Sequence, residues 1–148
     1  MIENELARLL KAVIEIERQD FSGLGIIVTD QPDKLPITNL KIADQSYRLP
    51  AIGFQDILGT ILQVSSGDNP YHDGFHVIEP PFSLVALSQY FSTPIIKGSD
   101  VDYRFGSRFR TALYGSTLPH VTAVGVISQS YEAAIFIKGR KLELNAFL

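Results

Sequence analysis

The stretch FSGLGIIVTD, residues 21–30, decides the fold because it holds the first unbroken run of branched apolar residues in the chain. Ile26, Ile27 and Val28 follow one another between Gly25 and Asp30. A strand with one solvated face alternates apolar and polar residues, so an unbroken run predicts a strand that is buried on both faces. The stretch VTAVGVIS, residues 121–128, is also almost entirely apolar. We therefore expect it to be a central strand too.

Three segments have the character of helices. The first is IENELARLLKAVIEIER, residues 2–18, and its apolar residues recur at helical spacing on one face: Leu6, Leu9, Leu10, Val13 and Ile14. We expect this stripe to pack on the domain, and a dimer face is the alternative interpretation. AIGFQDILGTILQV, residues 51–64, is expected to be a second helix. GSRFRTALYG, residues 106–115, is typical of the start of a short one.

The remaining segments predict short strands and loops. Residues 31–50 contain three prolines and suggest a loop with one or two short edge strands. FHVI (75–78) and FSLVALS (82–88) are expected to pair through a connection at residues 79–81, followed by a loop over residues 92–99. AAIFIKGRKLEL (133–144) suggests a hairpin with Gly139-Arg140 as a two-residue turn. The chain is thus expected to form one mixed α/β layer structure.

Composition excludes several classes of protein. The 148 residues suit one domain with one sizeable core, and there is no cysteine to form a disulfide, a thiolate metal site or a nucleophile. The net charge of −3 gives no global basic field, so we expect no nucleic-acid partner. No apolar run approaches the roughly 20 residues that cross a bilayer. We expect a cytoplasmic protein without a membrane segment.

The tripeptide His72-Asp73-Gly74 is the first candidate for chemistry. An aspartate beside a glycine can stand on a sharp turn with its carboxylate exposed. A carboxylate suits Mg²⁺ or Mn²⁺, and it can accept a proton from an attacking hydroxyl. Asp-Gly is also one of the commonest turn dipeptides. The tripeptide alone therefore leaves open whether it forms a ligand site or simply a tight turn into a strand.

A second candidate is FGSRFRTAL, residues 105–113. Ser107 is a plausible N-cap for the helix that follows, and a helix N-terminus offers free backbone N–H groups to an anion. Arg108 and Arg110 add two guanidinium groups whose geometry matches phosphate. A capped helix with a solvated basic face is the alternative. Together the two segments suggest a nucleotide, with a metal at Asp73 and phosphates near Ser107 and the arginines.

These stretches resemble the diadenylate cyclase domain family. HDGF matches the family's Asp-Gly-Ala motif, and GSRFR matches its Gly-Thr-Arg-His-Arg helix start. Weaker matches follow in the right order: GLGIIV, LSQYF and VGVISQSYEAAIFIKGRKL. The resemblance covers roughly residues 22–142. It implies an α/β fold with a mixed central sheet flanked by helices. We therefore expect the chain to divide into an N-terminal helix, residues 1–20, and the nucleotide-binding domain, residues 21–148.

The resemblance also implies a reaction. Each of two protomers that meet face to face binds ATP with Mn²⁺ or Mg²⁺, and each 3′-hydroxyl attacks the other α-phosphate to form cyclic di-AMP. Asp73 would be catalytic and bind the metal, with His72 as a second metal ligand. Tyr90 would stack on adenine, although a core or surface tyrosine is equally compatible with the sequence. The other residues implied to contact nucleotide are Gly74, Phe75, Ser107, Arg108, Arg110 and Ser128.

Three departures from the family pattern bear on catalysis. Phe75 replaces an alanine and is expected to add a ring next to the nucleotide, and Phe109 replaces a histidine in the phosphate site. Gln129 stands where the family commonly has glutamate. These changes favour an adenine-nucleotide-binding domain that senses ATP or a cyclic dinucleotide. The retained Asp73 favours an active cyclase, and a structural interaction domain on the same fold is the third hypothesis.

Overall fold

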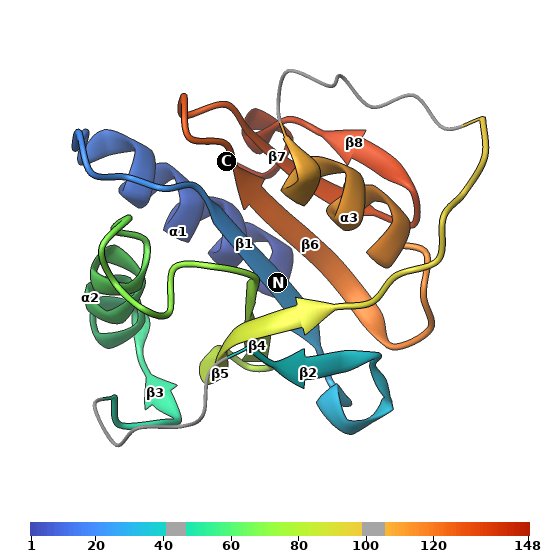
Figure 1. Cartoon of the computed structure of the whole chain (residues 1–148), viewed down its shortest axis with the longest axis horizontal. Helices are drawn as coiled ribbons and strands as arrows, with labels where there is room; N and C mark the ends of the chain where they lie inside the picture. The colour runs from blue at the N-terminus through green and yellow to red at the C-terminus, as the bar shows by residue number, and fades with distance from the viewer. Residues whose placement is uncertain (41–46, 99–105) are drawn as a thin grey trace.

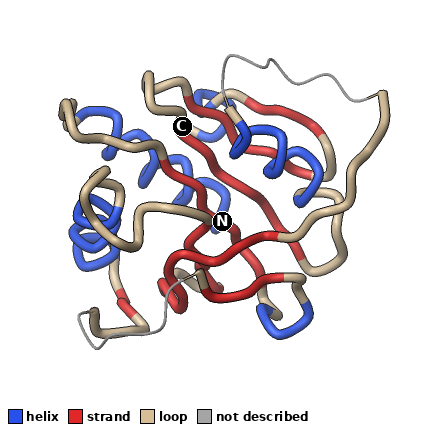
Figure 2. The backbone as a smooth tube through the Cα atoms, in the orientation of Figure 1, coloured by secondary structure: helices blue, strands red, loops and turns tan. Residues whose placement is uncertain are grey.

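A mixed sheet of eight strands forms the middle layer of the computed structural model, which describes residues 1–40, 47–98 and 106–148 (Figures 1 and 2). β1 and β4 are parallel, and the other pairs are antiparallel. The spatial order is β2 (Ile37–Asn39), β5 (Ser83–Phe91), β4 (Phe75–Glu79), β1 (Leu24–Thr29), β6 (Val121–Ile127), β7 (Ala133–Ile137) and β8 (Arg140–Leu142), while β3 (Ala51–Ile52) pairs with β5. The expected mixed central sheet is confirmed.

β1 lies at the centre of the sheet, as the unbroken apolar run predicts. All six of its residues are buried. It pairs with β4 through Ile27 and Val77, and with β6 through Ile26 and Gly125. β6 is also buried along nearly its whole length, which confirms the expectation for residues 121–128.

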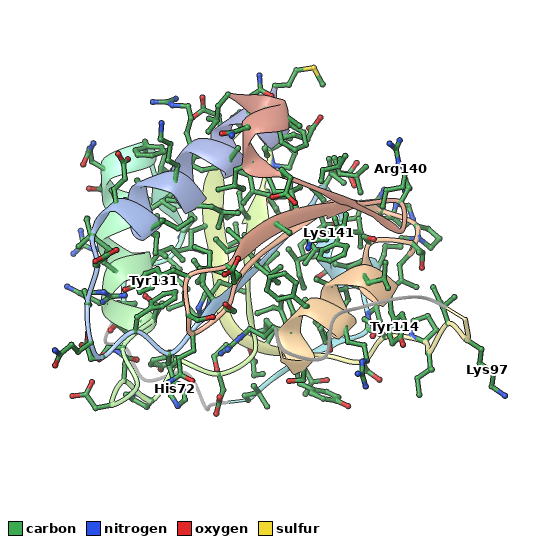
Figure 3. All side chains as sticks on the ribbon, turned by 90° about the horizontal axis from the view of Figure 1, so that it is seen from above. His72, Lys97, Tyr114, Tyr131, Arg140 and Lys141 are labelled. Carbon is green, nitrogen blue, oxygen red and sulfur yellow. The ribbon has the colours of Figure 1, made fainter. Side chains whose placement is uncertain are left out.

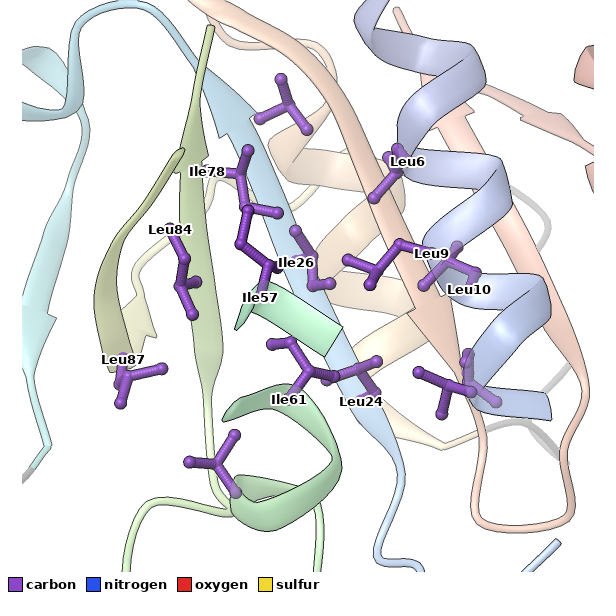
Figure 4. Packing of buried hydrophobic residues seen from close by; sticks show 14 of the residues in the cluster. Leu6, Leu9, Leu10, Leu24, Ile26, Ile57, Ile61, Ile78, Leu84 and Leu87 are labelled. Atoms are coloured by element: carbon purple, nitrogen blue, oxygen red, sulfur yellow. The ribbon is translucent and has the colours of Figure 1, made fainter. Parts of the chain in front are cut away.

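Two helices cover one face of this sheet. α1 (Ile2–Glu15) packs on β6, and α2 (Phe54–Val64) lies beside α1 (Figures 1 and 4). Gly125 on β6 leaves room for α1, because a Cβ there would meet Leu10 Cδ1 at 2.9 Å and Leu6 at 3.2 Å. Leu6, Leu9 and Leu10 are fully buried in this layer. The stripe on the first helix therefore packs on the domain, as expected, and does not form an exposed dimer face.

α3 (Ser107–Gly115) covers the opposite face and builds a second core cluster with the same sheet. Phe109 is buried and packs edge-on against Phe136 of β7, with ring centroids 6.1 Å apart. Phe75, the first residue of β4, packs edge-on against Phe91 at 5.6 Å. Its ring also lies against Gly25, where a Cβ would come within 2.6 Å of the ring carbons. A missing side chain on the central strand thus makes space for Phe75.

Several element boundaries differ from those expected. α2 begins at Phe54 because Ala51 and Ile52 pair with β5 as β3, and Gly53 adopts a φ of 93° between the two elements. β5 continues to Phe91, since pairing with β2 extends it past residue 88. The last hairpin turns at Lys138-Gly139, both at positive φ, whereas Gly139-Arg140 was expected. Two 3₁₀ turns, η1 (Pro32–Lys34) and η3 (Leu144–Phe147), complete the elements named here.

Replacing Gly25 with alanine is expected to lower the free energy of unfolding by about 1–3 kcal/mol, because the new methyl group would overpack the Phe75 ring. Gly59→Ala is the matched control. Gly59 lies inside α2 with open space around its Cα, so alanine there should raise stability by about 0.5–1 kcal/mol. Urea unfolding measures both changes.

A smaller side chain at residue 75 should relieve the clash. In the Gly25→Ala protein, Phe75→Leu should therefore recover part of the lost stability. If Gly25→Ala and Gly59→Ala changed stability in the same direction, the close packing of Phe75 on the central strand would be refuted.

Candidate functional site

A pocket of about 560 Å³ opens where β1 begins, α3 begins and β6 ends. Its volume lies in the range of about 300–1,000 Å³ that small-molecule sites occupy. Its polar side chains are those of four serines, one glutamine and one arginine. The lining residues are Ser22, Gly106, Ser107, Arg108, Ile127, Ser128, Gln129 and Ser130.

Arg108 forms one wall of the pocket and also ties three segments together. Its Nη1 donates to the carbonyl oxygen of Ser22 at 3.2 Å, its Nη2 to that of His72 at 2.8 Å, and its Nε to that of Gly74 at 3.4 Å. Burial lowers the pKa of the guanidinium, and the nearby Asp73 carboxylate opposes that shift. Arg108 therefore joins the pocket to the His72–Gly74 turn.

The turn itself is held from a second side by β5. The hydroxyl of Ser88 donates to the carbonyl oxygen of Asp73 at 3.0 Å. Gly74 has a φ of 76°, and a Cβ there would clash with the carbonyl of Gln89 and the side chain of Leu40. Glycine is thus required at this position by the protein's own packing, in addition to any approach of a ribose.

The side chain of Asp73 is 68% exposed. His72 Nδ1 lies 3.6 Å from Asp73 Oδ1, and it is buried without a hydrogen-bond partner among the described residues. A carboxylate and an unpaired imidazole nitrogen at this separation suit one divalent cation that takes its other ligands from phosphate and water. No cluster of three or more such side chains occurs within residues 1–40, 47–98 and 106–148. Figure 3 shows His72 far from Lys97 and Arg140, on the other side of the molecule.

The structure brings some of the expected residues together. Ser107, Arg108 and Ser128 all line the pocket. Ser128 is 9% exposed, and its hydroxyl lies 3.1 Å from that of Ser130 and accepts the backbone N–H of Glu132 at 3.0 Å. Ser107 is not the N-cap that the sequence suggests, because Gly106 takes that place with a φ of 89°. Ser107 is instead the first residue of the helix.

Two further candidates lie outside the pocket lining. Arg110 is two positions beyond Arg108 on α3, about 200° around the helix axis, so it does not share the pocket with Arg108. Tyr90 is 56% exposed on β5, opposite Thr38 of β2.

The rings of Phe75 and Phe109 belong to the core, whereas the ring of Phe75 was expected to lie next to the nucleotide. Phe75 is 4% exposed and Phe109 is 1% exposed. Neither residue lines the pocket, so the ring of Phe75 does not contact a ligand there, and only its backbone atoms could do so. Of the three departures from the family pattern, Gln129 does line the pocket.

Sequence reasoning missed the support behind the turn. His76 is fully buried on β4, and its Nδ1 accepts the backbone N–H of Ser88 at 3.1 Å. Burial, and then the charge of Arg108, lower the pKa of His76 to about 3. A lone histidine inside the apolar run FHVI is the signal that could have drawn attention to it. No sequence motif marks Ser22 or Ser130 as a site residue, because only the fold brings them to the pocket.

Comparison with solved structures places this arrangement in a known fold. A double cysteine mutant of DacA from Staphylococcus aureus, a diadenylate cyclase, superposes with a TM-score of 0.62 at 15% identity, covering 98% of this chain and 89% of that one. A hypothetical membrane-spanning protein from Bacillus cereus superposes with a TM-score of 0.67 at 17% identity. That match covers 93% of this chain but 60% of the Bacillus cereus chain.

These matches confirm a diadenylate-cyclase-like fold, and at such low identity they show the fold alone. No family model matches the sequence, and no curated protein matches it significantly. Within the described residues, no helix has the length and apolar character needed to span a membrane.

The buried His76 predicts that the protein loses stability in mild acid. Below pH 6.5 the unfolded chain protonates this histidine while the folded protein does not, so stability falls as the pH drops from about 6.5 toward 3. The slope is at most about 1.4 kcal/mol per pH unit. Urea unfolding at pH 7 and pH 5 should therefore show a loss about 2 kcal/mol larger for the wild type than for His76→Gln.

His120→Gln is the matched control, because His120 is exposed. This variant removes a histidine at the surface, so it separates the effect of losing an imidazole group from the effect of losing the buried one. Equal losses in the wild type and His76→Gln would show that His76 takes up a proton in the folded protein.

Proposed function

We propose that this chain, a domain of diadenylate-cyclase-like fold, binds an adenine nucleotide with its phosphates in the pocket at the start of α3. The observation that carries the proposal is the convergence there of the Arg108 guanidinium, the first turn of α3 and the hydroxyls of Ser107, Ser128 and Ser130. Arg108 also donates to the turn that carries Asp73, so one side chain links the phosphate pocket to the turn of the candidate metal ligand.

The chemistry of the pocket suits phosphate. The first backbone N–H groups of a helix lack partners within the helix, and together with the helix dipole they favour an anion. Arg108 donates to carbonyl oxygens from three of its nitrogens, and a guanidinium has five N–H groups, so two N–H groups remain for a ligand. Serine hydroxyls can turn to donate to phosphate oxygens. The resulting site is polar and carries one positive charge among its described lining residues.

Asp73 and His72 would complete the site as ligands of Mn²⁺ or Mg²⁺. A bound divalent cation would neutralise phosphate charge that Arg108 alone cannot balance. Asp73 would hold the cation through its exposed carboxylate, and His72 would contribute Nδ1. Arg108 and Ser88 hold the carbonyl groups of the turn that carries both side chains.

An active diadenylate cyclase is the second candidate, and the positions of Phe75 and Phe109 favour it. Both rings lie in the core, so neither obstructs the pocket. Asp73 would then accept the proton of the ATP 3′-hydroxyl as it attacks an α-phosphate held by a second protomer, and pyrophosphate would leave. Gln129 in the pocket lining favours the sensor, because glutamine cannot supply the charge of the family's glutamate. A sensor would bind ATP or a cyclic dinucleotide without turnover.

Calorimetry with ATP and Mn²⁺ tests nucleotide binding. The wild type should bind ATP more tightly than adenosine, because the pocket recognises phosphate. Ser130→Trp should weaken ATP at least about tenfold by filling the pocket. Ser92→Trp, at an exposed position outside the pocket lining, is the control and should leave binding unchanged. Equal affinity for ATP and adenosine, or equal effects of the two tryptophans, would rule out a phosphate site here.

Mass spectrometry of the same ATP mixtures separates the two candidates. An enzyme should accumulate cyclic di-AMP, and Asp73→Asn should abolish it while Asp33→Asn, at an exposed aspartate of η1, should not. Binding without product would support the sensor. Product that persists in Asp73→Asn would exclude Asp73 from catalysis.

A further inference from the structure

We infer that Ser88 is the positioning residue that holds Asp73 in place for its ligand. The inference rests on the proposed function, since it assigns Asp73 to a metal and nucleotide site. It starts from three polar contacts that join Ser88 to His76, Asp73 and Leu40 on neighbouring segments.

Ser88 is the extra residue of a β-bulge. Phe75 pairs with Gln89 and Val77 pairs with Ala86, so His76 alone on β4 faces both Leu87 and Ser88 on β5. Ser88 adopts a φ of 52°, which is uncommon for residues other than glycine. Such a conformation persists where the surroundings enforce it, and it occurs often at functional sites.

Every polar group of Ser88 has a partner. Its N–H donates to His76 Nδ1 at 3.1 Å, its carbonyl accepts the N–H of Leu40 at 2.9 Å, and its hydroxyl donates to the carbonyl of Asp73 at 3.0 Å. Ser88 is 1% exposed, so water cannot replace these partners. The hydroxyl therefore has one fixed direction, toward the backbone of Asp73.

His76 keeps Ser88 in this position at neutral pH. Its pKa of about 3 means that the ring is uncharged, so Nδ1 is free to accept the N–H that the bulge removes from the strand ladder. The charged group that faces it is Arg108, which contacts the same turn. His76 thus supports Ser88, and Ser88 supports Asp73.

The carbonyl of Asp73 is held by Ser88, while Arg108 holds the carbonyls before and after it. Three consecutive peptide groups are thereby fixed from two elements, and the Asp73 carboxylate is left to face outward. Without the Ser88 hydroxyl, the middle carbonyl loses its partner and the peptide group can rotate. We expect the carboxylate to lose its direction while the pocket and Arg108 stay in place.

The test compares Ser88→Ala with Ser116→Ala. Ser116 is also 1% exposed, and its hydroxyl bonds the carbonyl of Leu113 at 2.8 Å and the N–H of Gly139 at 2.9 Å, away from the pocket. The readout is the ratio of ATP affinity with Mn²⁺ to ATP affinity in EDTA, measured by calorimetry. Ser88→Ala should reduce this ratio about tenfold, as the loss of a residue that orients a metal ligand does. Ser116→Ala should leave it unchanged.

A merely structural role would lower both affinities together or neither. An unchanged ratio in Ser88→Ala would therefore overturn the inference. If the wild type bound no nucleotide, the proposed function would fail, and the backbone NMR shifts of residues 72–74 would still test Ser88. Those shifts should change in Ser88→Ala and not in Ser116→Ala, and unchanged shifts would refute the positioning role.

Discussion

Burial of β1 on both faces is the constraint on which the other features depend. All six residues of this strand are buried, so each face of the sheet needs its own cover. α1 and α2 supply it on one side and α3 on the other. Gly25 and Gly125, on the two central strands, let Phe75 and the leucines of α1 approach closely. The layer that covers β1 also places the start of α3 beside the start of β1 and the end of β6.

The candidate site follows from this layered arrangement. The start of β1 contributes Ser22, the turn before β4 contributes residues 72–74, and the turn after β6 contributes residues 128–130. Arg108 bonds to the first two of these segments and lines the pocket with the third. A single half-buried guanidinium thus connects the phosphate pocket to the turn that carries Asp73. Ser88 and His76 restrain the same turn from the other side.

The sequence predicted the features that depend on local pattern. Unbroken apolar runs identified β1 and β6, and helical spacing identified α1 and its buried face. The resemblance to diadenylate cyclases predicted the fold. Motif matching showed that Phe109 replaces a histidine, but it did not show that the ring is buried. The spacing of Phe109, Ala112 and Leu113 could have shown this, because it is that of a buried helical face, and it turns Arg108 and Arg110 to different sides. Ser88 was beyond prediction, because its bulge exists only once β4 and β5 have paired.

The most direct test of the account is to map the metal with Mn²⁺, whose unpaired electrons broaden NMR signals of nearby amides. With ATP present, the account predicts broadening at residues 72–74 first, then at 106–108 and 128–130, and little broadening without ATP. The carboxylates of Asp20 and Asp68, both hydrogen-bonded to Ser66 at the surface, are an alternative place for the cation to bind. Broadening centred on those two residues, and independent of ATP, would contradict a nucleotide and metal site at Asp73.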